Sequence, residues 1–391
     1  MRNLFTALVL LFLFATEILR VYFIMPFPGS QQENSIAVAY WLSRNIWWLR
    51  LGGLLILAFL LIDKVRRGKP LPIIGWGIAL LLYGFVFFMF NYRFEADKMF
   101  YQPENKSFSS AAADTSNGSG LVIGVVINGE AKAYPIEIIG YHHQVRDTVG
   151  RIPVMVTYCT VCRTGRVFSP EVEGKAEHFR LVGMDHFNAM FEDATTGSWW
   201  RQATGEAIAG EEKGKKLPEI YSQQVTLASW VKQYPQTLIL QPDPVFRKKY
   251  EGLKGYDVGI INSKLEKRDS ASGHFKSWVV GVQVGKNARS YDWNLLRNKG
   301  LLEDSLAGLP LVVFLEKDTN SFHAFSRNVG GVALQFQRVD STGWITDTDT
   351  HSLWSPYGLC TQGQLKGLQL GHVRAYQEFW HSWKTFHPDS E

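Results

Sequence analysis

The stretch Leu121-Val-Ile-Gly-Val-Val-Ile-Asn-Gly-Glu-Ala-Lys-Ala-Tyr134 decides the fold class of this chain. Its apolar opening is a β-type run, and Asn128-Gly129 is a strong signal for a type I′ hairpin turn. The residues after the turn return as a second strand. Gly281-Val282 and Ala288-Arg-Ser-Tyr291 repeat the pattern 157 positions further along. The sequence therefore predicts a β-hairpin that occurs twice.

The repetition continues through the rest of the chain. At the same offset Asp147 matches Asp304, and Phe168-Ser169 matches Phe325-Ser326. The offset then falls to 154 and to 153, where the matching residues are Asp193, Thr196, Ser198 and Trp200 with Asp347, Thr350, Ser352 and Trp354, and Ser229-Trp230 with Ser382-Trp383. A period above a hundred residues indicates duplicated domains rather than a solenoid. We predict tandem domains at residues 121–240 and 278–391, joined by a connector at 241–277.

Each half carries the signals of an α+β fold in which β-structure dominates. A short helix is expected after Pro135, because the β-type alternation ends there. Residues 152–158 read as a buried strand, and residues 309–315 repeat it. Residues 226–234 are expected to form a second short helix with Trp230 packed inward.

Three apolar stretches open the chain, at residues 4–25, 46–62 and 71–90. A helix needs about 20 residues to cross the hydrocarbon core, so residues 1–95 are predicted to be an anchor of about three transmembrane helices. Glu17 and Arg20 stand three positions apart on one helix face and are expected to pair. Arg50 lies in the second stretch, which is marginal in length, and is expected to reach toward the interface.

The charge of the loops predicts the orientation of the anchor. Asp63-Lys-Val-Arg-Arg-Gly-Lys69 is strongly basic, and basic loops stay in the cytoplasm. With three spans, everything after residue 91 lies outside. We expect a protein of the inner (plasma) membrane with its C-terminal domain on the periplasmic side. Residues 96–120, rich in Ser, Ala, Asn and Gly, are predicted to be a tether.

The composition excludes several classes of partner. Hydrophobic residues make up 46% and charged residues 20%, which is typical of a folded chain. The formal net charge of +5 is not spread as a basic patch with interleaved aromatics, so no nucleic-acid partner is expected. No phosphate-binding loop is present in the sequence, and no nucleotide cofactor is expected.

The two halves differ most informatively at a Cys-x-x-Cys motif. In the first half the buried strand ends in Tyr158-Cys159-Thr-Val-Cys162-Arg163, whereas the second half has Leu315-Glu316-Lys-Asp-Thr319. A feature that only stabilised the fold would be expected in both copies, so the thiols are interpreted as a site. Covalent haem c requires a His directly after the second Cys, and Arg163 occupies that position, so haem c is excluded.

Such a motif supports two kinds of chemistry. A pair of cysteines can act as a redox dithiol, or it can supply two soft ligands to copper or zinc. Further candidate ligands lie in the same half: His142, then Met184 and His186, which would share a face on a strand. Cys, His and Met together favour copper. The predicted metal ligands are therefore Cys159, Cys162, His142, Met184 and His186.

Two other functions remain open on the sequence. One is an enzyme, a thiol–disulfide oxidoreductase in which one of Cys159 and Cys162 attacks and the other resolves; the chain lacks the βαβ context of thioredoxin-like enzymes. The other is a non-catalytic binding or assembly module whose Cys-x-x-Cys is structural. The sequence leaves open whether the protein is an enzyme, and it names no protein partner.

Three motifs carry a resemblance to a known family. They are Tyr141-His-His-Gln-Val-Arg-Asp147, Val156-Thr-Tyr-Cys-Thr-Val-Cys-Arg-Thr-Gly165 and Thr196-Gly-Ser-Trp-Trp-Arg-Gln202. With them the chain, over about residues 95–391, resembles a bacterial family described as domain of unknown function 3179. The resemblance implies no activity. The family's His, strand and Thr-Tyr-Cys-x-x-Cys loop correspond to His142, Cys159 and Cys162, which favours His142 over His143 as a partner.

Overall fold

The computed structural model describes residues 2–32, 34–66, 70–339 and 343–390. The chain forms two compact units. The first contains Met1–Tyr101, Glu177–Arg201 and Glu206–Lys216, and the second contains Gln102–Ala176, Gln202–Gly205 and Leu217–Glu391. Residues of the predicted first domain, 121–240, therefore contribute to both units.

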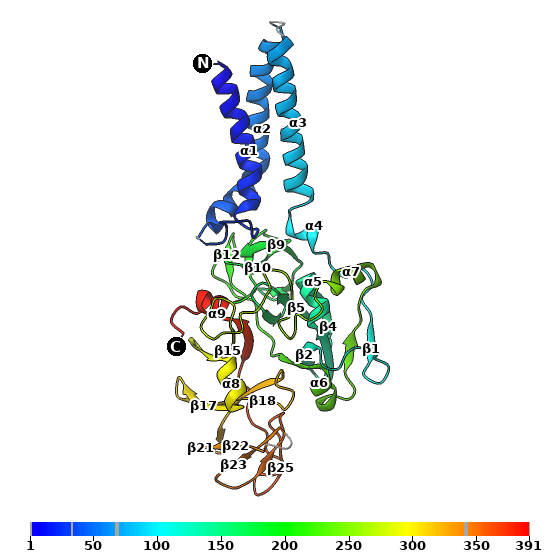
Figure 1. Cartoon of the computed structure of the whole chain (residues 1–391), viewed down its shortest axis with the longest axis vertical. Helices are drawn as coiled ribbons and strands as arrows, with labels where there is room; N and C mark the ends of the chain where they lie inside the picture. The colour runs from blue at the N-terminus through cyan, green and yellow to red at the C-terminus, as the bar shows by residue number, and fades with distance from the viewer. Residues whose placement is uncertain (1, 33, 67–69, 340–342, 391) are drawn as a thin grey trace. The chain divides into compact units, whose positions relative to one another are not determined.

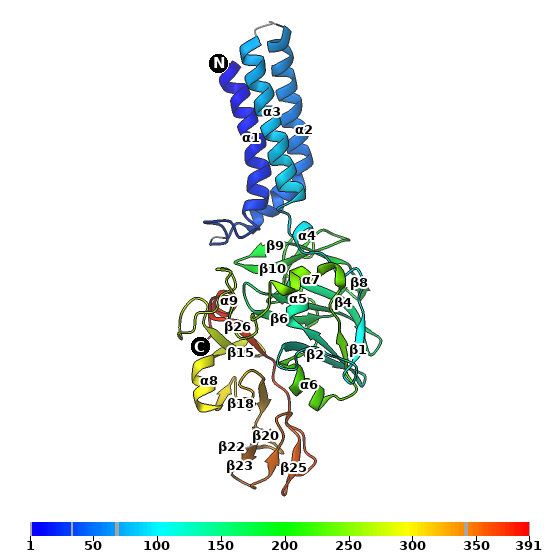
Figure 2. The same cartoon turned by 45° about the vertical axis from the view of Figure 1, so that its right-hand side comes forward.

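Three long helices begin the first unit: α1 (Arg2–Tyr22), α2 (Ile36–Arg66) and α3 (Pro70–Tyr92). They run side by side, as Figures 1 and 2 show from two directions. Each is long and apolar enough to span a membrane. Helix α2 is longer than the apolar stretch 46–62 that the sequence analysis identified, because it begins at Ile36. Arg67, Gly68 and Lys69 of the basic loop lie outside the described residues.

A polar network joins these helices. The Glu17 carboxylate on α1 accepts hydrogen bonds from Arg50 Nε and Nη2 of α2 at 2.6 and 2.7 Å. Tyr83 and Asn91 of α3 also donate to this carboxylate. The expected pairing of Glu17 with Arg20 is wrong: Arg20 instead pairs with Glu95, 2.7 Å away. A buried charge is costly inside a membrane unless it is paired, and the neighbouring helices supply the partners.

The first unit also contains a four-stranded sheet in the order β12-β11-β10-β9. Its strands are β9 (Phe179–Asp185), β10 (Asn188–Asp193), β11 (Trp199–Arg201) and β12 (Ala207–Ala209). The segment after α1 contacts this sheet, because Met184 N donates to Ile24 O at 2.7 Å. Tyr40 of α2 packs edge-on against Trp199. The short helix α4 (Ala96–Met99) adds an ion pair between Asp97 and Arg180.

The second unit begins with the elements of the first half. A five-stranded sheet has the order β1-β14-β3-β2-β13, and a three-stranded sheet has the order β4-β5-β6. The bounds are β1 (Phe108–Ser110), β2 (Leu121–Ile127), β3 (Glu130–Pro135), α5 (Ile136–His142), β4 (Gln144–Val149), β5 (Ile152–Cys159), β6 (Thr164–Phe168), β7 (Glu171–Val172), β8 (Lys175–Ala176), β13 (Gln223–Thr226), α6 (Leu227–Gln233), β14 (Leu238–Leu240), η1 (Pro244–Phe246) and α7 (Arg247–Glu251).

The elements of the second half follow in the same unit. They form sheets in the orders β16-β15-β26, β17-β18-β19 and β22-β23-β24-β25. The bounds are β15 (Trp278–Val284), β16 (Asn287–Asp292), α8 (Trp293–Lys299), β17 (Leu301–Leu306), β18 (Leu309–Leu315), β19 (Phe322–Ser326), β20 (Asn328–Val329), β21 (Val332–Ala333), β22 (Phe336–Val339), β23 (Trp344–Asp347), β24 (Leu353–Trp354), β25 (Cys360–Gln362), β26 (Ala375–Phe379) and α9 (Trp380–Phe386). Most of the described residues after the anchor thus lie in or between short strands, and helices are few.

Corresponding residues of the two halves make corresponding contacts. Asp147 accepts hydrogen bonds from Lys132 at 3.0 Å and from Tyr134 at 2.7 Å. In the second half Asp304 accepts from Arg289 at 2.6 Å and from Tyr291 at 2.8 Å. Asp193 and Asp347 likewise each accept from a Trp indole seven residues later, at 2.9 Å in both cases. The same local interactions therefore recur at the offsets that the sequence predicts.

The segment expected to be a tether, residues 96–120, contains regular structure. Helix α4 opens it, and β1 pairs antiparallel with β14, with Phe108 opposite Leu240. The carboxylate of Asp243 accepts hydrogen bonds from the backbone amides of Glu104 and Asn105 at 2.8 and 2.7 Å. The prediction of a plain tether was wrong here, because β14, which is distant in sequence, supplies the pairing that local composition does not indicate.

One glycine in each half lies against a buried tryptophan. A Cβ added at Gly124 of β2 would overlap the Trp230 indole, and one at Gly281 of β15 would overlap Trp383. Both indoles are fully buried. A glycine is therefore required at each position so that a helix can pack its Trp directly on the strand.

We predict that Gly124→Ala and Gly281→Ala each lower the free energy of unfolding by about 1–3 kcal/mol, the usual cost of overfilling a packed core. Denaturant titration of the full chain in detergent, followed by Trp fluorescence, measures the loss. Gly371→Ala is the control, since a Cβ there would meet its nearest neighbour, Ser326, at 3.8 Å. Equal stability of all three variants would contradict this packing.

Candidate functional site

The Cys-x-x-Cys motif forms the turn between strands β5 and β6. Cys159 is the last residue of β5 and lies opposite Thr164, the first residue of β6. Arg163 has a positive φ of 57°, which closes the turn in a left-handed conformation. The hairpin is braced by Gln202, whose amide donates to Thr157 Oγ1 at 3.0 Å and to Thr164 O at 2.9 Å. The predicted buried strand is confirmed, and it ends at the first cysteine.

Both sulfur atoms are shielded from solvent. Cys159 and Cys162 are present as thiols and are 0% exposed. Burial, a hydrogen bond with Cys159 and its nearby charge raise the pKa of the Cys162 thiol well above its usual range, and a hydrogen bond with Ser382 opposes this only in part. Glu378 adds to the rise. In this state Cys162 is a protonated thiol and a poor nucleophile.

Arg163 carries a positive charge into the interior beside the thiols. Its guanidinium donates to Gln377 Oε1 at 2.8 Å and to the backbone carbonyls of Tyr256 and Asp257 at 3.1 and 3.0 Å. It also stacks over the Trp278 ring, 3.9 Å from the centroid. Among the described residues it forms no ion pair with a carboxylate. The turn therefore contains a buried cation that neutral groups solvate.

The second half supplies one wall of the site. Arg166 of β6 forms an ion pair with Glu378 of β26, and both side chains are almost completely buried. Glu378 also accepts a hydrogen bond from Ser382 at 3.1 Å, and Ser382 lies 3.4 Å from the Thr164 hydroxyl. Burial opposes the charge on Arg166, but Glu378 holds its pKa above the ordinary value. These contacts connect the dithiol turn to β26 and α9.

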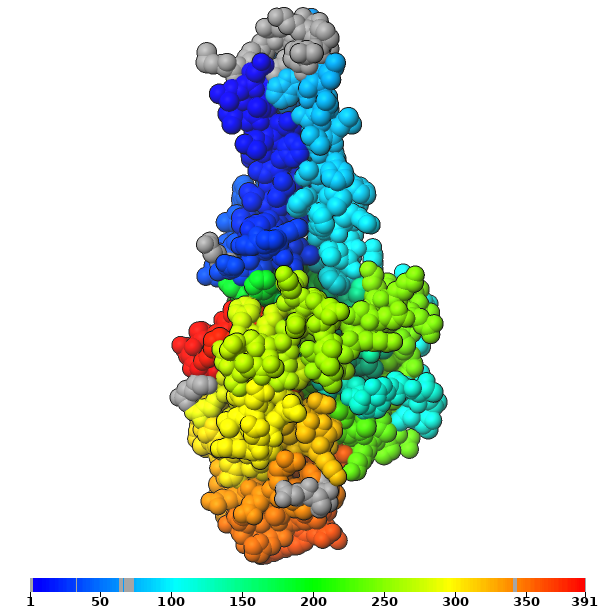
Figure 3. All heavy atoms as spheres, viewed as in Figure 1, coloured from blue at the N-terminus to red at the C-terminus, as the bar shows by residue number. Residues whose placement is uncertain are grey.

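The connector supplies the opposite wall. The Thr160 hydroxyl between the cysteines donates to Glu266 at 2.8 Å, and the Tyr256 hydroxyl donates to Thr160 O at 2.8 Å. Burial lowers the pKa of Lys276, whereas the nearby Cys162, Glu266 and Cys159 raise it in part. Figure 3 shows residues around 250 to 277, in yellow-green, on the surface of this unit. The ammonium group of Lys276 therefore lies within electrostatic reach of both sulfurs.

The two adjacent histidines have different surroundings. His142 is the last residue of α5, and its Nε2 lies 2.7 Å from the Tyr250 hydroxyl of α7. Burial lowers the pKa of His143 to about 4, and a hydrogen bond with Tyr141 and the charge of Glu266 oppose this. Glu266 also binds Thr160, so this carboxylate of the connector acts on both His143 and the dithiol turn.

Met184 and His186 belong to the first compact unit. The sequence predicts that their side chains share one face of a strand. Met184 lies on β9, but the strand ends at Asp185, and His186 has a positive φ of 50° in the turn that follows. His186 Nδ1 lies 2.6 Å from Asp185 Oδ1, and Arg201 binds the other oxygen at 2.7 Å. His186 therefore lies outside the strand, and the alternation of side chains along a strand does not determine its direction.

The sequence analysis did not identify the residues near the C-terminus that lie close to the sulfurs. His381 on α9 is stacked on Phe275 at 4.1 Å. Burial and the charge of Lys276 lower its pKa to about 4, while a hydrogen bond with the Val161 backbone opposes the fall. His381 replaces Ala228 at the offset of 153, so a comparison of the two halves contained a signal that could have identified it.

Among the described residues, no group of three or more His, Cys, Asp and Glu side chains is close enough together to hold a metal ion. The site thus offers two adjacent sulfurs as soft ligands, with an ammonium group, a buried guanidinium and hydroxyl groups around them. Two-sulfur coordination suits soft monovalent ions, whereas structural zinc requires four ligands.

The fold and the site together define a β-rich protein with a buried dithiol turn and three helices fit to span a membrane. The chain belongs to the family described as "Protein of unknown function (DUF3179)", whose model matches residues 101–390. No curated protein and no solved structure shows significant similarity to the chain. The anchor helices lie before the matched region.

We predict that Arg166→Met lowers the free energy of unfolding by about 3–5 kcal/mol, because it leaves the Glu378 charge buried without its partner. Denaturant titration of the full chain measures the loss. Arg297→Met, on the exposed surface of α8, should change stability by less than about 0.5 kcal/mol.

The double variant Arg166→Met/Glu378→Gln should recover much of the lost stability, since it removes both charges. A double variant as unstable as the single one would contradict the role of charge at this contact.

Proposed function

We propose that this protein is a membrane-anchored copper(I)-binding protein whose metal ligands are the thiolates of Cys159 and Cys162. The observation that carries the proposal is that two thiols are hydrogen-bonded to one another at the end of a strand and are completely shielded from water. Soft thiolate ligands select copper(I). Burial would also protect the bound ion from oxidation and from competing ligands in solution.

The charges around the thiols support an anionic complex. Copper(I) bound by two thiolates has a net charge of −1, and binding releases both thiol protons. The ammonium group of Lys276 lies within electrostatic reach of both sulfurs, and the Arg163 guanidinium forms no ion pair with a carboxylate in the described structure. Bound copper would give the partly buried Lys276 cation a counter-charge. The raised pKa of the Cys162 thiol is then a property of the metal-free state.

The histidine and methionine ligands of the predicted five-residue copper site are not required by this proposal. His142 Nε2 is engaged by Tyr250, and the proposal uses only the sulfurs. The choice of copper over zinc rests on the ligand number that the turn offers. Lys276 would act on the complex through its charge rather than as a ligand.

Orientation and duplication are parts of the same proposal. The basic residues between α2 and α3 favour a cytoplasmic loop, which would leave residues 102–391 on the periplasmic side of the inner membrane. The activity of a phosphatase fused after residue 391 would report this orientation. We further propose that the two halves are a tandem duplication in which only the first has the Cys-x-x-Cys motif; the recurring Asp147 and Asp304 contacts support it.

A thiol–disulfide oxidoreductase is the second candidate, since the adjacent thiols could form a disulfide and pass two electrons and two protons to a disulfide substrate. The nearby Lys276 ammonium would favour a thiolate. Against it, the Cys162 pKa is raised and both sulfurs are inaccessible, whereas reactive cysteines are partly exposed with lowered pKa values.

Anaerobic titration of the full chain in detergent with copper(I), in competition with a chromophoric chelator, tests the proposal. We expect one tightly bound copper(I) per chain, and none in the Cys159→Ser/Cys162→Ser variant. Cys360→Ser is the matched control, because Cys360 is also buried but lies in the second half. Lys276→Met should weaken binding by about 10-fold through the loss of one counter-charge.

Two results would contradict the copper proposal. One is a wild-type chain that binds no copper(I) while its thiols cycle with a disulfide reagent, which would favour the oxidoreductase. The other is binding that survives loss of both motif cysteines. Thiols that neither bind copper nor react in the folded chain would indicate a structural motif.

A further inference from the structure

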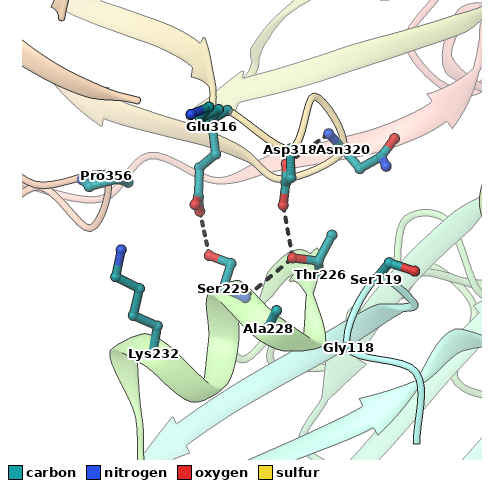
Figure 4. Close-up of a pocket in the computed structure, with 11 residues that line it drawn as sticks. Gly118, Ser119, Thr226, Ala228, Ser229, Lys232, Glu316, Asp318, Asn320 and Pro356 are labelled. Carbon is teal, nitrogen blue, oxygen red and sulfur yellow. Dashed lines mark hydrogen bonds between the residues drawn. The ribbon is translucent and has the colours of Figure 1, made fainter. Parts of the chain in front are cut away.

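A pocket of about 550 Å³ lies between elements of the two halves, within the second unit. Its lining residues, shown in Figure 4, come from the loop before β2, from β13 and α6, and from the turn after β18: Gly118, Ser119, Thr226, Ala228, Ser229, Lys232, Glu316, Lys317, Asp318, Asn320 and Pro356. This volume is in the range of small-molecule sites. Apolar surface predominates in the lining, but two carboxylates and two lysines, Glu316, Asp318, Lys232 and Lys317, also contribute to it, which suits a small ligand with charged groups.

The pocket is the counterpart of the dithiol site. Glu316 follows Cys159 by 157 positions, and Ser229 precedes Ser382 by 153, the offsets that relate the two halves. Ser229 donates to Glu316 in this pocket, whereas at the other site Ser382 bonds to Cys162, the second cysteine of the motif. A carboxylate thus stands where the first half has a thiol.

Glu316 is held in position and keeps one acceptor available. Its Oε1 accepts hydrogen bonds from the Ser229 hydroxyl and from His323 Nε2, the latter at 2.7 Å. Among the described residues no hydrogen bond reaches Oε2, and this atom is not among the fully buried polar atoms without a partner. His323 is buried and fixes the carboxylate from behind. A ligand donor can therefore bind Oε2 without displacing an internal contact.

Asp318 and Lys232 have different roles in the pocket. The oxygens of Asp318 accept from the hydroxyls of Thr226 and Ser321 at 2.8 and 2.6 Å and from two backbone amides, so Asp318 fixes the turn. Lys232 of α6 is exposed and forms no ion pair in the described part of the chain. Figure 4 shows its side chain extending from the helix along the pocket toward Pro356. One carboxylate acceptor and the Lys232 cation are thus available to a ligand, and the exposed Lys317 also lines the pocket.

We propose that this pocket binds a small zwitterion with the chemistry of a free α-amino acid. Its ammonium group donates to Glu316 Oε2, and its carboxylate pairs with the Lys232 ammonium. A ligand with only a negative charge would be repelled by Glu316, and a ligand with only a positive charge would be repelled by Lys232. This proposal does not depend on copper binding, because none of its residues belongs to the dithiol turn.

Calorimetric titration of the full chain in detergent tests the proposal, with L-alanine, L-glutamate, L-lysine and L-phenylalanine as probes. We expect at least one of them to bind. Its N-acetyl derivative, which lacks the ammonium group, and its amide, which lacks the carboxylate, should each bind about 10- to 100-fold more weakly, the loss of one charge-assisted contact.

Two substitutions locate the binding. Lys232→Met should weaken it about 10-fold, and Lys286→Met, at an exposed lysine of the β15–β16 turn, should leave it unchanged. Glu316→Gln should also weaken the binding. If Glu316→Gln is unstable, Lys232→Met still tests the proposal, because Lys232 is exposed. Absence of binding by all four probes, or equal binding of the blocked derivatives, would overturn the proposal.

Discussion

The ion pair between Arg166 and Glu378 is the interaction on which the arrangement of the second unit depends. It connects β6 of the first half to β26 of the second, and both side chains are removed from water. Such a pair contributes specificity more than net stability, because desolvation offsets most of the attraction. Here the specificity is positional: β26 is held beside the dithiol turn, and Ser382 and His381 of α9 follow it.

The opposite contact between the halves is built from the same elements with different chemistry. Where β26 meets the Cys159–Cys162 turn, β13 meets the Glu316–Asn320 turn, and Thr226 bonds to Asp318. One contact is closed and contains two thiols, and the other is an open pocket with charged side chains in its lining. A scaffold with two similar contacts permits one to specialise without loss of the fold, which is consistent with a Cys-x-x-Cys motif in one half only.

Much of the fold could be predicted from the sequence because its signals are local. The hairpin at Asn128-Gly129, the three apolar helices and the strand ending at Cys159 each rest on residues close in the chain. Most of the wall of the dithiol site could not be predicted, since Lys276 and Glu378 reach it from more than a hundred residues away. The sequence analysis also missed the pairing of Glu17 with Arg50 and of β1 with β14. The reason is the same, because each partner is distant in sequence.

X-ray absorption spectroscopy at the copper edge, on the full chain loaded with one copper(I), tests the central claim most directly. The account predicts a copper(I) ion with two sulfur ligands and no nitrogen ligand, because the turn offers Cys159 and Cys162 and His142 Nε2 bonds to Tyr250. A first shell that contains nitrogen, or one that has four ligands, would contradict it.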